Sequence, residues 1–97
     1  MYSRTEVLGR LGANPDQKNG VTWFPIAETE KWTDKDGEKQ EKTTWHRAVI
    51  FNEKLGNLCL EYLEKGSTVF TAGRYDFEYD ENKNCKATYK VREVKFL

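Results

Sequence analysis

Hydrophobic and polar residues alternate along most of the chain with a period of two, and runs rich in Gly, Asn, Asp and Lys separate the alternating stretches. Alternation at period two is typical of β-strands with one buried face, and the interrupting residues favour turns. The pattern therefore predicts five strands. They cover residues 4–11, 21–32, 43–51, 67–79 and 86–97.

One segment has a helical period instead. Between residues 53 and 65, apolar side chains recur at spacings of three and four, which places them on one face of a short amphipathic helix. Those side chains are Leu55, Leu58, Cys59, Tyr62 and Leu63. Gly66 follows as a candidate C-cap, because glycine tolerates the left-handed conformation that often ends a helix.

Turn-forming residues mark the connections. Residues 12–16 form a loop by composition, residues 33–41 a hairpin connection and residues 80–84 a polar hairpin tip. Pro25 cannot donate a hydrogen bond, so we expect an edge position or a bulge there. Gly73 predicts a bend in the fourth strand.

Three strands, a helix and two further strands make up the element order of the OB-fold. We therefore predict a mostly β chain, with residues 1–97 as a single domain. The expected architecture is a five-stranded Greek-key barrel with one short helix between the third and fourth strands. OB-folds bind oligonucleotides or oligosaccharides on the face of their second and third strands.

The third predicted strand carries an unusual set of side chains. Alternation places Trp45, Arg47, Val49 and Phe51 on one face and His46, Ala48 and Ile50 on the other. The second set is a modest core stripe. The first combines two large rings with a guanidinium, which suits single-stranded nucleic acid, because bases stack on rings while phosphates meet cations.

Composition excludes several other classes of protein. Sixteen Lys and Arg balance sixteen Asp and Glu, so any affinity for phosphate rests on local placement of charge. No stretch is apolar enough to span a membrane, and residues 1–4 lack the start of a signal peptide. Cys59 and Cys85 fit no metal spacing and are expected as free thiols, with one disulfide as the alternative. The single histidine, His46, has no nucleophile or metal partner in the sequence, so we expect no catalytic residues, metal, cofactor or small-molecule substrate.

The ordered motifs resemble the single-stranded DNA-binding proteins of the bacterial and mitochondrial type. The resemblance covers nearly the whole chain. It rests on Leu8-Gly9-Arg10-Leu11-Gly12, Asn14-Pro15-Asp16, residues 27–32, Thr43-Thr44-Trp45-His46-Arg47 with Val49 and Phe51, Tyr62-Leu63-Glu64-Lys65-Gly66, and Gly73. It implies an OB-fold that assembles as a homotetramer and binds single-stranded DNA in replication, repair and recombination, with replication proteins as further partners.

The resemblance also implies roles for individual residues. Base stacking falls to Trp32, Trp45 and Phe51, and to Phe77 or Tyr79, of which we prefer Tyr79. Lys65 is expected to contact a phosphate, as is Arg47 from the stacking face. His46 is expected at the subunit interface. Two cationic sets are either phosphate contacts or solvated surface: Lys35, Lys39 and Lys42 in the hairpin, and Lys86, Lys90 and Arg92, with Thr88, in the last strand. Trp23 has no counterpart in the family pattern and is expected in the core or an interface.

The chain departs from the family pattern in two places. It stops at Phe96-Leu97, before the acidic tail of bacterial members, so it is either a truncated chain or a mitochondrial-type member. The pattern of residues 74–79 favours the second, and we expect the mitochondrial matrix, with a bacterial or phage cytoplasm as the alternative. The loop at residues 16–20 is also shortened. The rival function is an OB-fold protein-interaction module of a replisome that has lost DNA binding.

Overall fold

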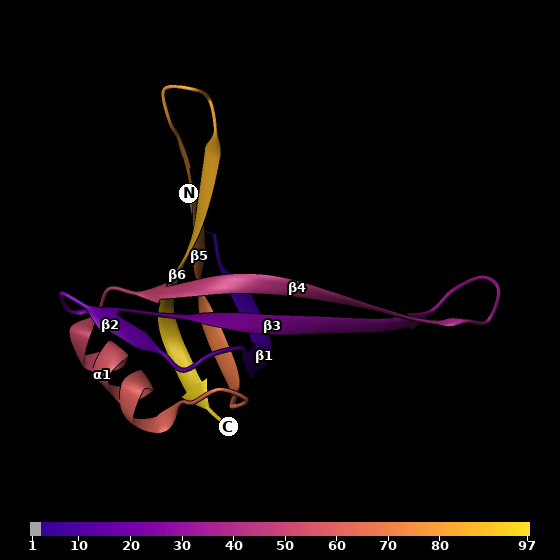
Figure 1. Ribbon diagram of the computed structural model, residues 1–97, viewed down its shortest axis with the longest axis horizontal. Coiled ribbons are helices and arrows are strands. Elements are labelled where there is room, and N and C mark those ends of the chain that lie inside the picture. The colour runs from indigo at the N-terminus through magenta and orange to yellow at the C-terminus, as the bar shows by residue number, and fades with distance from the viewer. Residues whose placement is uncertain (1–2) are drawn as a thin grey trace.

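The computed structural model describes residues 3–97, and Met1 and Tyr2 lie outside the described residues. Within that range six strands and one helix follow one another along the chain (Figure 1). Their bounds are β1 Thr5–Leu11, β2 Asp16–Lys18, β3 Val21–Thr33, β4 Lys39–Ile50, α1 Glu53–Tyr62, β5 Thr68–Tyr79 and β6 Cys85–Phe96. All five predicted strands and the helix are therefore present. The short strand β2 is an addition that the hydrophobic pattern does not predict.

The strands close into a barrel. They form one sheet in the order β1-β5-β6-β4-β3-β2, and a further pairing between β1 and β3 completes the circle. Neighbouring strands are antiparallel except β4 and β6, which pair in parallel at Ala48 with Tyr89. The three-residue β2 only extends the rim, so the barrel has five main strands with α1 between β4 and β5. The predicted OB-fold is confirmed.

The barrel interior is filled by the inward-facing residues that alternation predicts. Its buried members are Val7, Leu11, Phe24, Ile26, Ala48, Ile50, Cys59, Leu63, Val69, Tyr89 and Val91. Tyr89 is the largest of them, and its hydroxyl lies 3.0 Å from the Thr71 hydroxyl and 3.3 Å from the Thr5 carbonyl oxygen. The core therefore pairs its one phenol with hydrogen-bond partners, as buried polar groups require.

Two hairpin arms leave the barrel in different directions, one formed by β3 and β4 and the other by β5 and β6 (Figure 1). At each tip one aspartate, Asp34 or Asp80, accepts two backbone N–H hydrogen bonds of 2.9 Å. Gly37 supplies the positive φ of 79° that the first turn needs. Both predicted hairpin tips are confirmed.

The helix is shorter than predicted, and its predicted apolar face is only partly buried: Cys59 and Leu63 lie in the core and Leu55 packs against it. It ends at Tyr62, and the C-cap is Leu63, whose backbone is extended while its N–H still donates to the Cys59 carbonyl at 2.9 Å. The expectation that Gly66 caps the helix is therefore wrong: Gly66 lies in the following turn, where its N–H donates to the Leu11 carbonyl at 2.8 Å. Leu58 and Tyr62, two members of the predicted apolar face, are exposed. The buried side of the helix also includes Gly56, where an added Cβ would lie 2.4 Å from the Thr22 hydroxyl, and a glycine gives no hydrophobic signal in the sequence.

Gly73 lies at a β-bulge, as the predicted bend requires. An added Cβ there would lie 2.0 Å from the carbonyl oxygen of Lys90, a backbone atom that cannot move aside cheaply. The pairs made by Ala72 and Gly73 skip Arg92 on β6. The predicted cationic stripe of the last strand is therefore broken after Lys90.

One edge of β3 pairs with β4, and the other pairs first with β2 and then with β1. Pro25 lies between the β2 and β1 pairings. Pairing with β2 ends at Trp23, and pairing with β1 begins at Ile26. The Pro25 carbonyl accepts the Gly12 N–H at 3.1 Å, while the register with β4 continues unbroken. Of the two predicted alternatives, the local edge position holds and the bulge does not.

Candidate nucleic-acid interface

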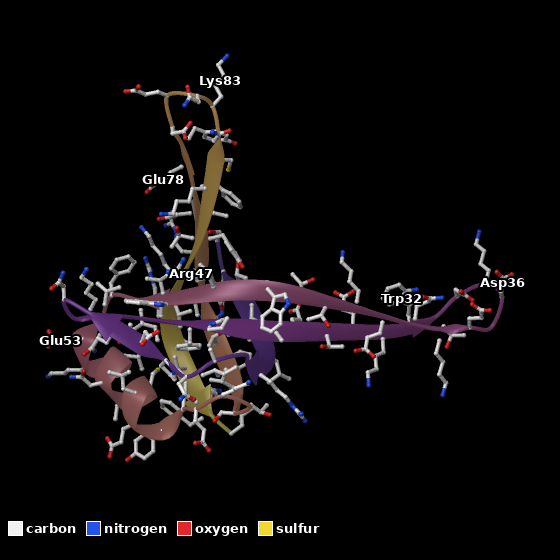
Figure 2. The ribbon with its side chains drawn as sticks, viewed as in Figure 1. Trp32, Asp36, Arg47, Glu53, Glu78 and Lys83 are labelled. Carbon is white, nitrogen blue, oxygen red and sulfur yellow. The ribbon has the colours of Figure 1, made fainter. Side chains whose placement is uncertain are left out.

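The outer face of β4 carries the rings that the sequence singles out. Trp45 is 61% exposed, and Phe51, directly after the strand, is 57% exposed. Arg47 lies between them along the chain, exposed at the point where the two arms diverge (Figure 2). Among residues 3–97 Arg47 forms no ion pair, so its charge is available to an anion from outside.

The Trp45 indole packs against Gly12, a contact that the sequence analysis did not predict. An added Cβ at Gly12 would lie 2.5 Å from the Cζ3 atom of the indole, so the ring rests against the glycine backbone. This contact supports one part of the ring and leaves the rest exposed to solvent. The only sequence signal for this contact is Gly12 itself, just after β1. A glycine is already expected there because the segment is a turn, so the signal is not informative.

A cleft separates the outer face of β3 and β4 from the β5–β6 arm. We call it the hairpin cleft, and its lining includes Val21, Trp23, Arg47, Phe51, Lys86 and Lys90. Its volume is about 460 Å³. The Lys90 Nζ lies 5.5 Å from the centre of the Phe51 ring and 2.5 Å from an oxygen of Asp76. The Lys90 hydrogen bond, with nearby Arg74, lowers the pKa of the Asp76 carboxyl below its usual value.

Trp32 is 47% exposed near the end of β3, as its predicted stacking role requires. Figure 2 shows Trp32 on the β3–β4 arm. There it lines a shallow depression together with Lys31, Lys39 and Gln40. In the register Trp32 pairs with Gln40 and Ala27 with Trp45, so the two tryptophans lie on opposite local faces of the arm. The structure therefore does not gather Trp32 with Trp45 and Phe51.

Phe77 and Tyr79 are 62% and 73% exposed on the β5–β6 arm. They follow Tyr75, which is half-buried and stacks on Tyr89 at a centroid distance of 5.0 Å. The expectation that the inner end of this stripe covers the core is confirmed. Lys86 and Lys90 lie on the other face of the arm by alternation, so the two outer rings do not line the hairpin cleft.

Lys65 also lies outside the hairpin cleft. Its backbone N–H donates to Oδ1 of Asn14 at 2.7 Å, which fixes the turn after α1 to the loop between β1 and β2. The same loop contains Gly12, on which Trp45 rests. Lys65 is exposed, and the loop to which its turn is fixed is the one on which Trp45 rests.

His46 lies on the inner side of β4, half-buried at the root of the β5–β6 arm. Its Nδ1 shares a hydrogen bond with the Tyr75 hydroxyl, and its Nε2 is 3.6 Å from a carboxylate oxygen of Glu28. That distance is too long for a hydrogen bond, so Nε2 is buried without a hydrogen-bond partner among residues 3–97. Burial, with smaller contributions from Tyr89 and Glu28, raises the pKa of the Tyr75 phenol. The interface role expected of His46 stays a prediction.

Other chemistry is sparse in the part of the chain that the structure describes. No group of three or more His, Cys, Asp or Glu side chains there could hold a metal ion. Neither of its cysteines forms a disulfide, and burial raises the pKa of the Cys59 thiol to about 11. No helix between residues 3 and 97 has the length and apolar character needed to cross a membrane.

A sequence model described as the single-strand binding protein family matches residues 2–96. The chain belongs to this family. It is 34% identical to the mitochondrial single-stranded DNA-binding protein of Oryctolagus cuniculus over 96 residues, with 87% of this chain and 65% of that protein covered. It is 44% identical to a single-stranded DNA-binding protein of Xanthomonas axonopodis over 77 residues, with 72% and 42% covered. The chain thus spans just under two thirds of the rabbit relative.

Solved structures agree with the family assignment. A Plasmodium falciparum single-strand binding protein in complex with single-stranded DNA superposes with a TM-score of 0.86 at 28% identity, with 100% of this chain and 96% of that chain covered. The family resemblance expected from the sequence motifs is confirmed, and the matched relatives include both mitochondrial and bacterial proteins.

Proposed function

We propose that the protein binds single-stranded DNA without sequence preference and protects it during replication, repair and recombination. The observation that carries this proposal is the outer face of β4, where Trp45 and Phe51 are more than half exposed on either side of Arg47. Large exposed rings beside an unpaired cation are costly in water unless a partner covers them. Bases and phosphates supply matching surfaces.

The proposed mechanism is capture by stacking, without enzymatic activity. Trp32, Trp45 and Phe51 stack on bases, with Phe77 or Tyr79 extending the path along the second arm. Arg47 and Lys65 neutralise phosphates. Duplex DNA presents no free base faces, so binding to duplex is expected to be weak, while a sugar hydroxyl adds little and discrimination against RNA is modest. Affinity falls with salt, but with a shallow slope because few cations take part.

Tryptophan fluorescence during titration with oligo-thymidine tests this proposal, with a duplex of equal length as control. We expect strong quenching with the single strand and little with the duplex. Trp45→Ala should weaken binding by about 1–3 kcal/mol, the contribution of one stacked base. Absence of quenching at low salt would mean that the rings are idle, and a protein-interaction module would then become the better-supported function.

Gly12→Ala offers a second test that leaves every ring in place. The new methyl group would displace the Trp45 indole from its contact with Gly12, since the two would otherwise lie 2.5 Å apart. We expect weaker binding than wild type but stronger binding than Trp45→Ala. Equal affinity of Gly12→Ala and wild type would show that the position of this ring does not matter.

We further propose that the protein assembles as a homotetramer. Within the described residues β1 pairs with β3 only at Arg10 and Leu11, so much of β1 has a free edge, and Leu8 on the same strand is exposed. Unpaired edges and exposed leucines favour association with a second copy. His46 is the proposed interface residue. Sedimentation of His46→Ala below micromolar concentration should show smaller species, and intact tetramers would contradict its role.

The proposed compartment is the mitochondrial matrix, with replication proteins as further partners. The similarity to the rabbit mitochondrial protein extends over 96 residues and supports this choice. A bacterial cytoplasm remains the alternative, since the Xanthomonas relative is 44% identical over its shorter match. Fractionation of source cells with an antibody against the protein distinguishes the two compartments.

A further inference from the structure

Trp23 faces the hairpin cleft, although the family pattern assigns it no role. It pairs with Val49 of β4 and with Asp16 of β2, which puts it on the outer face with Arg47. Its neighbours Thr22 and Phe24 point into the core. Trp23 is half-buried and lines the cleft opposite the β5–β6 arm. Among residues 3–97 it makes no ring contact, so no neighbouring ring already stacks on its indole.

We propose that the hairpin cleft holds one nucleotide of the bound strand, with Trp23 as a stacking ring and Lys86 as a phosphate contact. This inference rests on the proposed function and adds a subsite to it. The volume of about 460 Å³ falls in the range of small-molecule pockets, roughly 300–1,000 Å³. Phe51 lines the same cleft, so a strand stacked on Phe51 passes Trp23 on its way.

The charges around the cleft suit a phosphate. Three cations, Arg47, Lys86 and Lys90, line it together with one carboxylate, Glu78. Lys90 is engaged by Asp76 at 2.5 Å. Arg47 and Lys86 form no ion pair among the described residues, and each can meet an anion without breaking an existing contact. Arg47 belongs to the outer face already described. Lys86, one of the last-strand cations whose role the sequence left open, is the contact that the proposal adds.

The rest of the lining suits a base. Val21, Val49 and the two rings give the cleft apolar walls, which a flat base can cover while its sugar and phosphate remain at the charged rim. A protein segment would bury the apolar walls equally well, but it would not supply anions to Lys86 and Arg47 unless it were acidic. The rings of Trp23 and Phe51 line the cleft together with Arg47 and Lys86, which form no ion pair among residues 3–97, and this combination favours a nucleotide.

Photochemical cross-linking tests the subsite in the unaltered protein. Oligo-thymidine substituted with bromodeoxyuridine is irradiated with the protein, and tryptic peptides are sequenced by mass spectrometry. Trypsin separates the three tryptophans into residues 19–31, 32–35 and 43–47. We expect adducts on Trp23 in the first peptide. Adducts on Trp45 or Phe51 without any on Trp23 would overturn the inference and leave the proposed function intact, whereas absence of binding would overturn both.

Substitutions give the energetic test. Trp23→Leu should raise the Kd for oligo-thymidine about 5- to 150-fold, the effect of one lost stacking contact, while Trp23→Phe should retain most of the affinity. Tyr62→Leu, which removes an exposed ring on α1, is the matched control and should leave the Kd unchanged. Thermal melting of each variant excludes unfolding as the cause. Equal Kd values for Trp23→Leu, Trp23→Phe and wild type would overturn the inference.

Lys86→Gln separates the ionic contribution. Losing one phosphate contact should reduce the slope of log K against log salt by about 0.7 for a single strand. Trp23→Leu should leave that slope unchanged, because stacking releases no counterions. An unchanged slope in Lys86→Gln would remove the phosphate contact from the proposal.

Discussion

The two faces of the β5–β6 arm differ in chemistry and in anchoring. One, the aromatic face, carries Tyr75, Phe77 and Tyr79, and its root packs on Tyr89 in the core. The other, the charged face, carries Asp76, Glu78, Lys86 and Lys90, and the last three of these line the hairpin cleft. One hairpin thus offers rings on one side and ions on the other. Because stacking is insensitive to salt and phosphate contacts are not, the two faces can be tested separately.

The root of the arm is common to both faces, so its disruption should have the largest effect. Gly73→Ala places a methyl group 2.0 Å from the Lys90 carbonyl oxygen and forces the backbone apart. We expect a loss of about 2–3 kcal/mol in the free energy of unfolding, measured by urea denaturation. Contributions of the aromatic face and of the charged face to DNA binding should both weaken in this variant.

Gly37→Ala is the matched control for that substitution. Gly37 has open space around it and only its φ of 79° favours glycine, so the expected cost is about 1 kcal/mol, without an effect on the arm. If Gly73→Ala were no less stable than Gly37→Ala, the close contact at the root would not hold the arm in place.

Much of this arrangement could be predicted from the sequence, because period two fixes which residues share a face of one strand. The core stripe of His46, Ala48 and Ile50 and the outer positions of Trp45 and Arg47 follow from it. The bend at Gly73 and both hairpin tips follow from turn chemistry.

The register and the relative orientation of neighbouring strands could not be predicted from the sequence. The separation of Trp32 from Trp45 depends on the register in which Trp32 pairs with Gln40. The direction in which each face of the β5–β6 arm points depends on the parallel contact of Ala48 with Tyr89, more than forty residues away along the chain. The helix buries Cys59 and Leu63 as predicted, but its contact with the barrel also includes Gly56, which has no hydrophobic signal, and it leaves Leu58 and Tyr62 exposed.

The aromatic face should contribute the next largest effect. Phe77→Ala and Tyr79→Ala each remove an exposed ring, and we expect the one that stacks to weaken oligo-thymidine binding by about 1–3 kcal/mol. The salt slope should stay the same in both variants. The more exposed ring, Tyr79, is the expected stacking residue. Full affinity in the double variant would show that the strand never reaches this face.

The anchoring of the aromatic face should respond to alkaline pH. Tyr75→Phe removes the hydrogen bond to His46, with an expected loss of about 1 kcal/mol in the free energy of unfolding near neutral pH. Burial raises the folded-state pKa of Tyr75, so the unfolded chain loses that proton first. The stability that neutral Tyr75 contributes is therefore present below about pH 10 and is lost as the pH rises through the raised pKa.

The measurement is the free energy of unfolding by urea denaturation at several pH values. Between about pH 9 and 11 the free energy of wild type should fall more steeply than that of Tyr75→Phe. Tyr89, whose pKa burial also raises, remains in both proteins. Parallel curves would mean that ionisation of Tyr75 is not linked to folding.

The smallest effect is expected on the charged face, from Asp76→Asn. The Asp76 carboxylate pairs with Lys90 at 2.5 Å and with Arg74 at 3.0 Å. It is only half-buried, so solvent screens both pairs and its removal should change the free energy of unfolding only slightly. Lys90 is then free to meet a phosphate. Binding to oligo-thymidine at low salt should tighten, and the salt slope should steepen by about 0.7.

Acid should not reproduce that change. The hydrogen bond from Lys90 lowers the pKa of Asp76 below its usual value, so this carboxyl stays ionised at about pH 5, and its contribution to stability is lost only at lower pH. The salt slope of wild type should therefore be the same at about pH 7 and pH 5, with Asp76→Asn steeper at both. Weaker binding by Asp76→Asn would assign the carboxylate a different role, that of holding Lys90 over the Phe51 ring in the orientation that the strand requires.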